Sequence, residues 1–220
     1  MNDIKLPSNI LIGGSTAAGK SFYLRNTLLP SLKGQYDVLV VFSPTMDVNG
    51  DYDYLKEDEK TIFKVSNRIY EATEEIIATQ TKMFKQAKEG FIVKDDIPRV
   101  LLIYDDCLNS RVFNDKGLLS KFAIKSRHYK VSILVTTQRI AGISRQFRLN
   151  CSQYIFFSVL NYSELERIVL ESVPKKYQKG IQDRLIDLYK TDFAFLFVNN
   201  RVRDPSKRFF ISGETLMEFE

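Results

Sequence analysis

The chain has 220 residues, of which 44% are hydrophobic and 27% are charged. These values are ordinary for a globular protein, and the length suffices for a real core within one α/β domain. The net charge of +5 is compatible with a polyanionic partner but does not require one. A single histidine and two cysteines exclude a His/Cys zinc cluster within one chain.

The cysteines and the apolar segments bear on the compartment in which the protein acts. Cys107 and Cys151 lie far apart in the sequence, so we expect a reducing compartment rather than a disulfide framework. Residues 1–7 contain no apolar core of a signal peptide. No apolar run approaches the roughly 20 residues that span a bilayer. We therefore expect a soluble, intracellular protein without a membrane span.

The first motif is a glycine-rich stretch at residues 14–21, with the sequence GSTAAGKS. It fits the pattern G-x-x-x-x-G-K-[ST] of a phosphate-binding P-loop. The apolar run 10–12 predicts a strand before it, and residues 21–29 predict a helix that ends at Pro30. Backbone N–H groups and the helix N-terminus would then face the phosphates. The residues expected to bind the triphosphate are Gly14, Ser15, Thr16, Ala17, Ala18, Gly19, Lys20 and Ser21.

Two residues of this motif have distinct expected roles. The Lys20 ammonium would reach the β- and γ-phosphates, and the Ser21 hydroxyl would bind Mg²⁺. The alternative interpretation is a glycine-rich turn with a surface lysine, and the context of strand, loop and helix argues against it.

A buried strand and an exposed loop are predicted next. Residues 36–43 form a continuous apolar run, which is typical of a parallel strand buried on both faces, and Pro44 ends it. Residues 45–59 are acidic and polar and predict an exposed loop. The D-x-x-G pattern at 47–50 resembles a GTPase switch, but no N-K-x-D motif follows it, so it is discounted.

Two amphipathic helices are expected to cover the sheet. Residues 67–89 predict the longest helix of the chain, with Asn67 as its N-cap and Gly90 as its stop. Residues 114–125 predict the second, with Asn114 as its N-cap. The helix at 67–89 carries no residues that indicate chemistry.

Between these helices lies the second informative stretch. Residues 100–104 predict a buried strand that ends in two carboxylates, Asp105 and Asp106. This is the Walker B pattern, in which one carboxylate holds Mg²⁺ and the next orients or deprotonates water. Ligands bind beyond the carboxyl ends of strands in such sheets, so this strand end can face the P-loop. The alternative, a simple boundary between a strand and a turn, is disfavoured by the P-loop earlier in the chain.

Two further strands follow along the chain. Residues 131–137 predict a core strand that is followed directly by Gln138. A polar amide at the end of a core strand beside Walker B lies where a sensor of the γ-phosphate would be. Residues 154–160 are again apolar and predict the next strand.

The C-terminal part predicts two helices and a β-hairpin. A capping box at residues 163–166 opens a short helix, and Pro174 suits the first position of another. Residues 193–198 and 208–212 predict an antiparallel hairpin at a sheet edge. The chain is thus expected to form one α/β domain over residues 1–220, a three-layer sandwich with a mostly parallel central sheet of the P-loop NTPase type.

Two segments resemble a known family. Residues 126–139 (SRHYKVSILVTTQR) resemble the arginine–strand–T-Q-R segment of the DNA-pumping ATPases of the FtsK–HerA superfamily. Residues 37–45, followed by 51–54, resemble the second strand of its viral genome-packaging members, the poxvirus-type and virophage ATPases. The Asp-Asp pair after 103–104 also fits this branch. The likeness extends from about residue 8 to about residue 170.

This resemblance implies a role for each matching residue. Residues 14–21 would bind ATP, Ser21 and Asp105 would hold Mg²⁺, and Asp106 would be the catalytic carboxylate. Gln138 would be the sensor. Arg127 matches the arginine finger that acts on the nucleotide of a neighbouring subunit. The runner-up fingers, or contacts to DNA phosphates, are Arg145 and Arg148.

The resemblance also implies a function. The chain would be an ATP-driven motor that moves double-stranded DNA into a viral capsid, as a homo-oligomeric ring that is pentameric or hexameric. DNA would be gripped through its phosphates, and a capsid or vertex protein would be a partner. The expected place of action is a virus factory in the host cytoplasm, or the virion. The candidate DNA contacts are Lys175, Lys176, Lys179, Arg201, Arg203, Lys207 and Arg208.

Two other functions remain open from the residues alone. A P-loop kinase for a nucleoside or nucleotide would need an acceptor pocket and an arginine-bearing lid, and nothing in residues 140–171 resembles a lid. A nucleotide-dependent switch would bind without turnover, and the intact pair of Asp105 and Asp106 argues against it.

Overall fold

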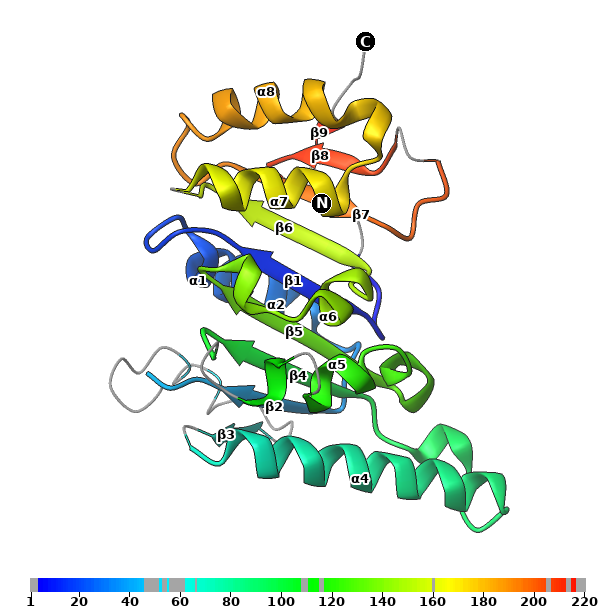
Figure 1. Ribbon diagram of the computed structural model, residues 1–220. Helices are drawn as coiled ribbons and strands as arrows, with labels where there is room; N and C mark the ends of the chain where they lie inside the picture. Colours follow the sequence, from blue (N-terminus) through cyan, green and yellow to red (C-terminus); the bar gives the residue numbers. More distant parts are fainter. Residues whose placement is uncertain are drawn as a thin grey trace.

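A twisted sheet runs through the middle of the molecule, and helices cover both of its faces (Figure 1). The computed structural model describes residues 4–45, 52, 55, 62–65, 67–107, 111–114, 117–159, 161–204, 207–212 and 215–216. Within these residues the sheet has nine strands in the order β3-β2-β4-β5-β1-β6-β7-β8-β9. The strands are β1 Asn9–Gly13, β2 Val38–Phe42, β3 Ile62–Val65, β4 Val100–Asp105, β5 Val131–Thr137, β6 Gln153–Phe157, β7 Phe195–Asn199, β8 Phe209–Ile211 and β9 Thr215–Leu216.

The strand directions divide the sheet into two parts. Strands β3, β2, β4, β5, β1 and β6 are parallel, and β7, β8 and β9 pair antiparallel along the C-terminal edge. The long apolar runs of β1, β4 and β5 are buried on both faces, as parallel strands require. The predicted mostly parallel sheet with an antiparallel C-terminal hairpin is confirmed.

Helices form the outer layers (Figure 1). On one face lie α1 Lys20–Tyr23, the π-helical turn η1 Leu24–Leu28 and α2 Leu29–Leu32. On the other face lie α4 Ile69–Lys88, α5 Leu118–Phe122, α6 Arg145–Leu149, α7 Tyr162–Ser172 and α8 Gln178–Leu188. The short 3₁₀ turns are η3 Lys94–Asp96, η4 Arg111–Phe113, η5 Ser126–Tyr129, η6 Ile140–Gly142 and η7 Lys175–Tyr177.

The core is split in two by the sheet. Successive strand residues point to opposite faces, so Leu11 joins the cluster under α4 to α8, whereas Ile10 and Ile12 join the cluster under α1 and α2. Strand β4 divides in the same way, with Leu102 on the first face and Ile103 on the second. Apolar packing on both faces establishes the predicted three-layer sandwich.

The helix after the P-loop differs from its prediction. It was expected to end at Pro30, but the helical path continues through Pro30 to Leu32. The preceding turn is a π-helix, in which the Leu29 N–H donates to the Leu24 carbonyl. A proline lacks an N–H and crowds the preceding turn, and the wider π turn accommodates it.

Three predicted helix starts are also corrected. Arg68, with φ 56°, precedes α4 in place of Asn67. Helix α5 begins after Gly117 because the Asn114 carbonyl accepts from the Gly117 N–H and the Ser120 hydroxyl, which closes a turn there. Asn161 caps α7 in place of the predicted capping box, since its side chain accepts from the Ser163 N–H.

One further difference concerns a strand. Strand β3 was not predicted, and it pairs parallel with β2 at the edge of the sheet. The predicted loop at 45–59, with the discounted D-x-x-G pattern, lies mostly outside the described residues. None of the described helices has the length and apolar character needed to cross a membrane.

Candidate nucleotide site

The parallel strands bring the predicted motifs to one edge of the sheet. In the register of β1, β5 and β4, Gly13 lies opposite Thr137, and Asp105 lies opposite Thr136. The loop after β1, the carboxylates after β4 and Gln138 after β5 therefore leave the sheet at the same level. In Figure 1 this is the edge at which the arrowheads of β1, β4 and β5 end.

The P-loop connects β1 directly to α1. Gly19 has φ 99°, a conformation that favours glycine, and precedes the first helical residue, Lys20. The Gly14 N–H donates to the Thr137 carbonyl at 3.2 Å, and the Ser15 N–H donates to the Ser158 carbonyl at 2.8 Å. These two bonds anchor the start of the loop between the ends of β5 and β6.

The Lys20 side chain lies within the curve of the loop. Its Nζ donates to the carbonyls of Gly14 and Ser15, each at 2.7 Å. Burial lowers the pKa of Lys20, and the negative charges of Asp106 and Asp105 partly oppose this effect. The ammonium is thus held inside the loop and faces the two carboxylates.

The two aspartates after β4 have different environments. Asp105 is 9% exposed, and its Oδ1 accepts a hydrogen bond from the Thr136 hydroxyl at 2.5 Å. The Asp106 N–H donates to the same hydroxyl oxygen at 3.1 Å, and Asp106 turns out of the strand with φ 52°. Thr136 therefore fixes one carboxylate in the core and directs the other outward to solvent.

Gln138 joins the P-loop to the aspartate pair. Its Oε1 accepts from the Thr16 hydroxyl at 2.9 Å, and its Nε2 donates to Asp106 Oδ2 at 2.7 Å. All three side chains are exposed, so they line an open site rather than the core. A single amide thus contacts both the loop that would carry phosphates and the outer carboxylate.

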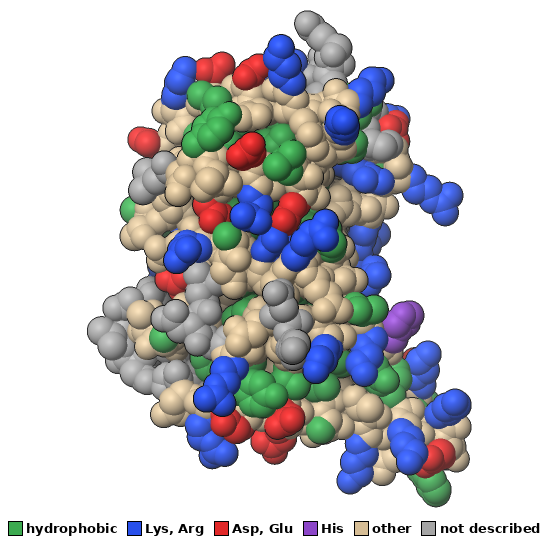
Figure 2. Space-filling model, viewed as in Figure 1, with side chains coloured by type: hydrophobic (Ala, Val, Ile, Leu, Met, Phe, Trp, Pro, Cys, Tyr) green, Lys and Arg blue, Asp and Glu red, His purple; other side chains and the backbone are tan. Residues whose placement is uncertain are grey.

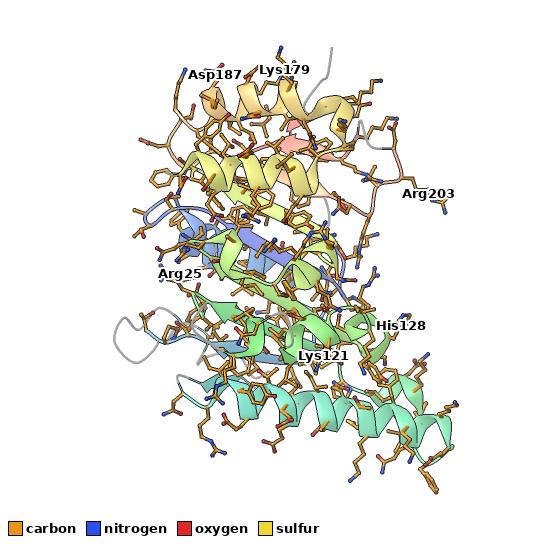
Figure 3. All side chains as sticks on the ribbon, in the orientation of Figure 1. Arg25, Lys121, His128, Lys179, Asp187 and Arg203 are labelled. Carbon is orange, nitrogen blue, oxygen red and sulfur yellow. The ribbon has the colours of Figure 1, made fainter. Side chains whose placement is uncertain are left out.

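Arg127 lies at the other end of β5. It belongs to η5, which precedes the seven residues of β5, whereas Gln138 follows them. At roughly 3.3 Å per residue, the strand separates the two ends by about 20 Å. Figure 3 shows the two edges, with Arg25 of the P-loop helix and His128 of η5 on opposite sides. Arg127 therefore lies far from the P-loop of its own chain.

The two runner-up arginines have opposite surroundings, although both belong to α6. Arg145 is exposed. Arg148 is 4% exposed, and its guanidinium forms a two-pronged ion pair with Glu171 at 2.6 Å and 2.6 Å. Its remaining nitrogen donates to the Ile140 and Ile143 carbonyls. Arg148 is committed to the interior of its own subunit, which argues against its use as a finger or a DNA contact.

Sequence reasoning missed two residues at this site, Thr136 and Phe193. Thr136 is a hydroxyl inside an otherwise apolar strand, a signal that could have been noticed beside the predicted Walker B strand. Phe193 lies next to Gly19, since a Cβ atom at Gly19 would be 3.0 Å from the Phe193 ring. No local pattern marked it, because it is distant in the sequence from the motif that it contacts.

Cys107, directly after the aspartate pair, does not supply a nucleophile. Burial, together with the charges of Asp105 and Asp106, raises the pKa of its thiol to about 12. Its Sγ donates to the Phe42 carbonyl at 3.2 Å. A neutral, buried thiol is a packing group rather than a reactive one.

The residues at this edge suit a magnesium nucleotide. Mg²⁺ prefers a few protein oxygens and completes its coordination with phosphates and water. Ser21 is an exposed hydroxyl at the start of α1, and Asp105 is a fixed carboxylate across the site. Among the described residues no group of three or more His, Cys, Asp or Glu side chains could hold a metal ion. Ser21 and Asp105 would supply two oxygen ligands, and phosphates and water would supply the others.

A glycine-rich loop between a parallel strand and a helix, beside an aspartate pair on a neighbouring strand, defines a P-loop NTPase. Residues 3–196 match the sequence model of the family described as Poxvirus A32 protein. The chain therefore belongs to this family, as its resemblance to poxvirus-type packaging ATPases of the FtsK–HerA superfamily predicts.

Known proteins similar to the chain come from several viruses. Uncharacterized protein L437 of Acanthamoeba polyphaga mimivirus is 26% identical over an alignment of 244 residues. The alignment covers 96% of this chain and 82% of that protein. The DNA-packaging ATPase B204 from Sulfolobus turreted icosahedral virus has a TM-score of 0.68 at 16% identity, over 97% of this chain and 98% of that one.

A second solved structure shares the whole fold. The genome-packaging NTPase B204 from Sulfolobus turreted icosahedral virus 2, in complex with AMPPCP, has a TM-score of 0.62 at 14% identity. The match covers 96% of this chain and 98% of that one. At these identities the likeness establishes the fold alone.

Proposed function

We propose that this protein is a Mg²⁺-dependent ATPase that moves double-stranded DNA into a viral capsid as a homo-oligomeric ring. The observation that carries the proposal is the bridge from Thr16 through Gln138 to Asp106. A side chain that contacts both the P-loop and the carboxylate can change its contacts when a γ-phosphate arrives or leaves. Membership of the A32 family and the fold of viral packaging ATPases support the same function.

The residues on this edge divide the work of hydrolysis. The N–H groups of the P-loop and the Lys20 ammonium would bind the phosphates, with Lys20 exchanging its loop carbonyls for phosphate oxygens. Ser21 and Asp105 would hold Mg²⁺, which neutralises charge on the phosphates when bound. Asp106, exposed and oriented by Gln138, would orient the attacking water and accept its proton.

The position of Arg127 supports a ring. Arg127 lies about 20 Å from its own site along β5, yet it is exposed at the opposite edge of the sheet. If neighbouring subunits face each other edge to edge, it can enter the site of the next subunit. An arginine supplied in trans contributes about 10³–10⁵ in rate in related NTPases. An isolated subunit should therefore hydrolyse ATP poorly.

Basic side chains at that same edge offer contacts for phosphates. Figure 2 shows many Lys and Arg side chains on the side that carries His128, away from the strand arrowheads of Figure 1. Burial lowers the pKa of Arg201, and the nearby positive charge of Arg127 lowers it further. Neighbouring cations of this kind favour a polyanion.

The candidate DNA contacts are not equally free to bind phosphates. Arg201 and Arg208 donate to backbone carbonyls, Arg201 to those of Lys5 and Pro7 and Arg208 to that of Val202. The remaining five candidates have exposed side chains and form two groups, one in η7 and α8 and one between β7 and β8. In Figure 3 Lys179 of the first group and Arg203 of the second point in different directions. The five are Lys175, Lys176, Lys179, Arg203 and Lys207.

The direct test measures ATP hydrolysis against protein concentration, with and without double-stranded DNA, alongside the molar mass in solution. Activity per subunit should rise with ring formation. Asp106→Asn should preserve nucleotide binding and abolish turnover, whereas Asp187→Asn, an exposed aspartate on α8, should change neither. A stable monomer with DNA and nucleotide present, or hydrolysis that D106N retains, would contradict the proposal. Phosphoryl transfer to an acceptor other than water would favour a kinase.

Mixed rings test Arg127 separately. R127A and D106N subunits should each be inactive alone. A mixture should regain activity, because an R127A subunit keeps its own carboxylate and can receive Arg127 from a D106N neighbour. If rings shown to contain both variants recovered no ATPase activity, Arg127 would not be the finger. The same mixture made with R145A in place of R127A is the matched comparison for the other exposed arginine.

A further inference from the structure

An exposed phenylalanine stands beside the P-loop in a conformation that is unfavourable for it. Phe193 is 67% exposed and has φ 60°. A bulky side chain rarely adopts this left-handed conformation, and such residues often occur where a ligand binds. An exposed aromatic ring and a strained backbone at the same position therefore suggest a use for the ring outside the core.

The surrounding fold places this ring at the nucleotide edge. Strand β7 runs antiparallel to β6, with Phe195 opposite Phe157, so the segment before β7 lies where β6 ends. The P-loop meets the same point, since the Ser15 N–H donates to the Ser158 carbonyl. In Figure 1 the segment that joins α8 to β7 lies on the side of the strand arrowheads.

The ring lies directly against the P-loop. A Cβ atom built on Gly19 would be 3.0 Å from Phe193 Cδ1 and 3.6 Å from Phe193 Cβ. Gly19 immediately precedes Lys20, the residue that would contact the phosphates. Phe193 is thus a neighbour of the phosphate site, although 174 positions separate it from Gly19 in the sequence.

Buried aromatic residues hold the start of β7, next to Phe193, in place. The Phe195 ring packs against Tyr23 of α1 with centroids 4.9 Å apart, and against Phe157 of β6 at 5.1 Å. The Ala194 N–H donates to the Thr191 carbonyl at 3.3 Å, which closes a turn around Phe193. The start of β7 is therefore fixed to the helix of the P-loop, while the Phe193 ring stays outside.

The polarity of the site indicates which end of a nucleotide this ring would meet. Asp106 and Gln138 follow β4 and β5, so the γ-phosphate end belongs on that side of the P-loop. Strands β6 and β7 lie on the other side of β1. A nucleotide held by the loop would therefore extend its ribose and base toward β6 and β7, where Phe193 is exposed.

We propose that the Phe193 ring is the stacking platform for the base of the bound nucleotide. The proposal rests on the nucleotide binding that is part of the proposed function. Stacking on an aromatic ring tolerates any base, because every base has a π face. Phe193 would therefore strengthen binding of ATP and GTP alike and would not select between them.

The test compares ligands with and without a base. Affinities for ATP, GTP and inorganic tripolyphosphate are measured by calorimetry on the full chain and on Phe193→Ala. Loss of one aromatic–base contact should weaken ATP and GTP binding about 5- to 150-fold and leave tripolyphosphate binding unchanged. Phe193→Tyr, which keeps the ring, should bind like the wild type. Phe91→Ala, a 75% exposed phenylalanine after α4, is the matched control and should change nothing.

Phe193→Gly shows whether a loss of ATP affinity comes from the missing ring or from a destabilised fold. Glycine adopts φ 60° freely, so this variant should be at least as stable as the wild type and still lose affinity for ATP. Unchanged ATP affinity in both variants would overturn the proposal, and so would an equal loss for tripolyphosphate. If the wild type bound neither ATP nor tripolyphosphate, the proposed function would fail as well, which separates the two failures.

Discussion

Replacing Arg148 by methionine tests whether this arginine holds the fold together or acts on a nucleotide. Its Nε and Nη2 atoms each donate to one carboxylate oxygen of Glu171 at 2.6 Å. Its Nη1 donates to the Ile140 carbonyl at 3.1 Å and also to the Ile143 carbonyl. Methionine keeps much of the apolar volume but donates nothing, so R148M leaves a carboxylate and two carbonyls without this donor.

The surroundings set the expected size of the effect. Removing one partner of a buried ion pair costs about 3–5 kcal/mol, because the other charge stays buried. The Glu171 side chain is 19% exposed and keeps Arg167 at 3.7 Å, so we expect a loss near the lower end, about 3 kcal/mol. For a chain of this size that corresponds to a melting temperature lower by about 6–12 °C.

Thermal and chemical denaturation of the nucleotide-free protein measure this loss. R145A, an exposed arginine of the same helix, is the control and should stay within about 0.5 kcal/mol of the wild type. Adding Glu171→Leu to R148M should recover part of the stability, since an apolar pair replaces the orphaned charge. If R148M lost less than about 1 kcal/mol yet abolished ATP turnover, the assignment of Arg148 to the interior would be refuted.

Three further predictions concern the nucleotide edge. Gln138→Ala removes the hydrogen bond to Asp106 and should lower the rate of ATP turnover by about 10²-fold with little change in nucleotide affinity. Single-turnover kinetics would measure the rate and calorimetry the affinity. An unchanged rate would exclude a sensor role for Gln138. Thr136→Val leaves Asp105 without its 2.5 Å donor and should cost about 1–3 kcal/mol of unfolding free energy in urea titrations, and a neutral result would mean that water replaces the hydroxyl. The raised pKa of Cys107, about 12 against a usual 9.0, contributes stability that is complete below about pH 9 and is lost as pH rises toward 12. Cys107→Ala should therefore lose less stability than the wild type between those pH values, and equal losses in alkaline urea titrations would contradict the burial of the thiol.

The residues that the structure brings together at the candidate nucleotide site could be named from the sequence because each belongs to a local pattern. The P-loop, the strand ending in Asp105 and Asp106, and Gln138 after a core strand each occupy a few consecutive residues. Apolar runs identify their strands as parallel, and the carboxyl ends of parallel strands meet at one edge. Pattern and topology together are therefore sufficient to bring these groups close to one another.

Other features depend on partners far along the chain. Arg145 and Arg148 lie in one short helix and look equivalent in sequence, but only Arg148 meets Glu171 of α7. The predicted start of α5 at Asn114 is wrong because the Asn114 carbonyl closes a turn there. No sequence pattern reveals the hydrogen bonds of a backbone carbonyl. A side chain's environment is set by the neighbours that folding brings to it, and local propensity carries no information about them.

The sequence by itself determined the class of the protein and its layered α/β architecture, and it predicted the candidate site residues that follow β1, β4 and β5. Only the tertiary structure decided how those residues are held, with Thr136 fixing Asp105 and Gln138 joining Thr16 to Asp106. It also separated Arg127 from its own P-loop by the length of β5 and set Phe193 against Gly19. The reason is that motifs record short-range chemistry, whereas distances between segments follow from the packing and register of the whole sheet.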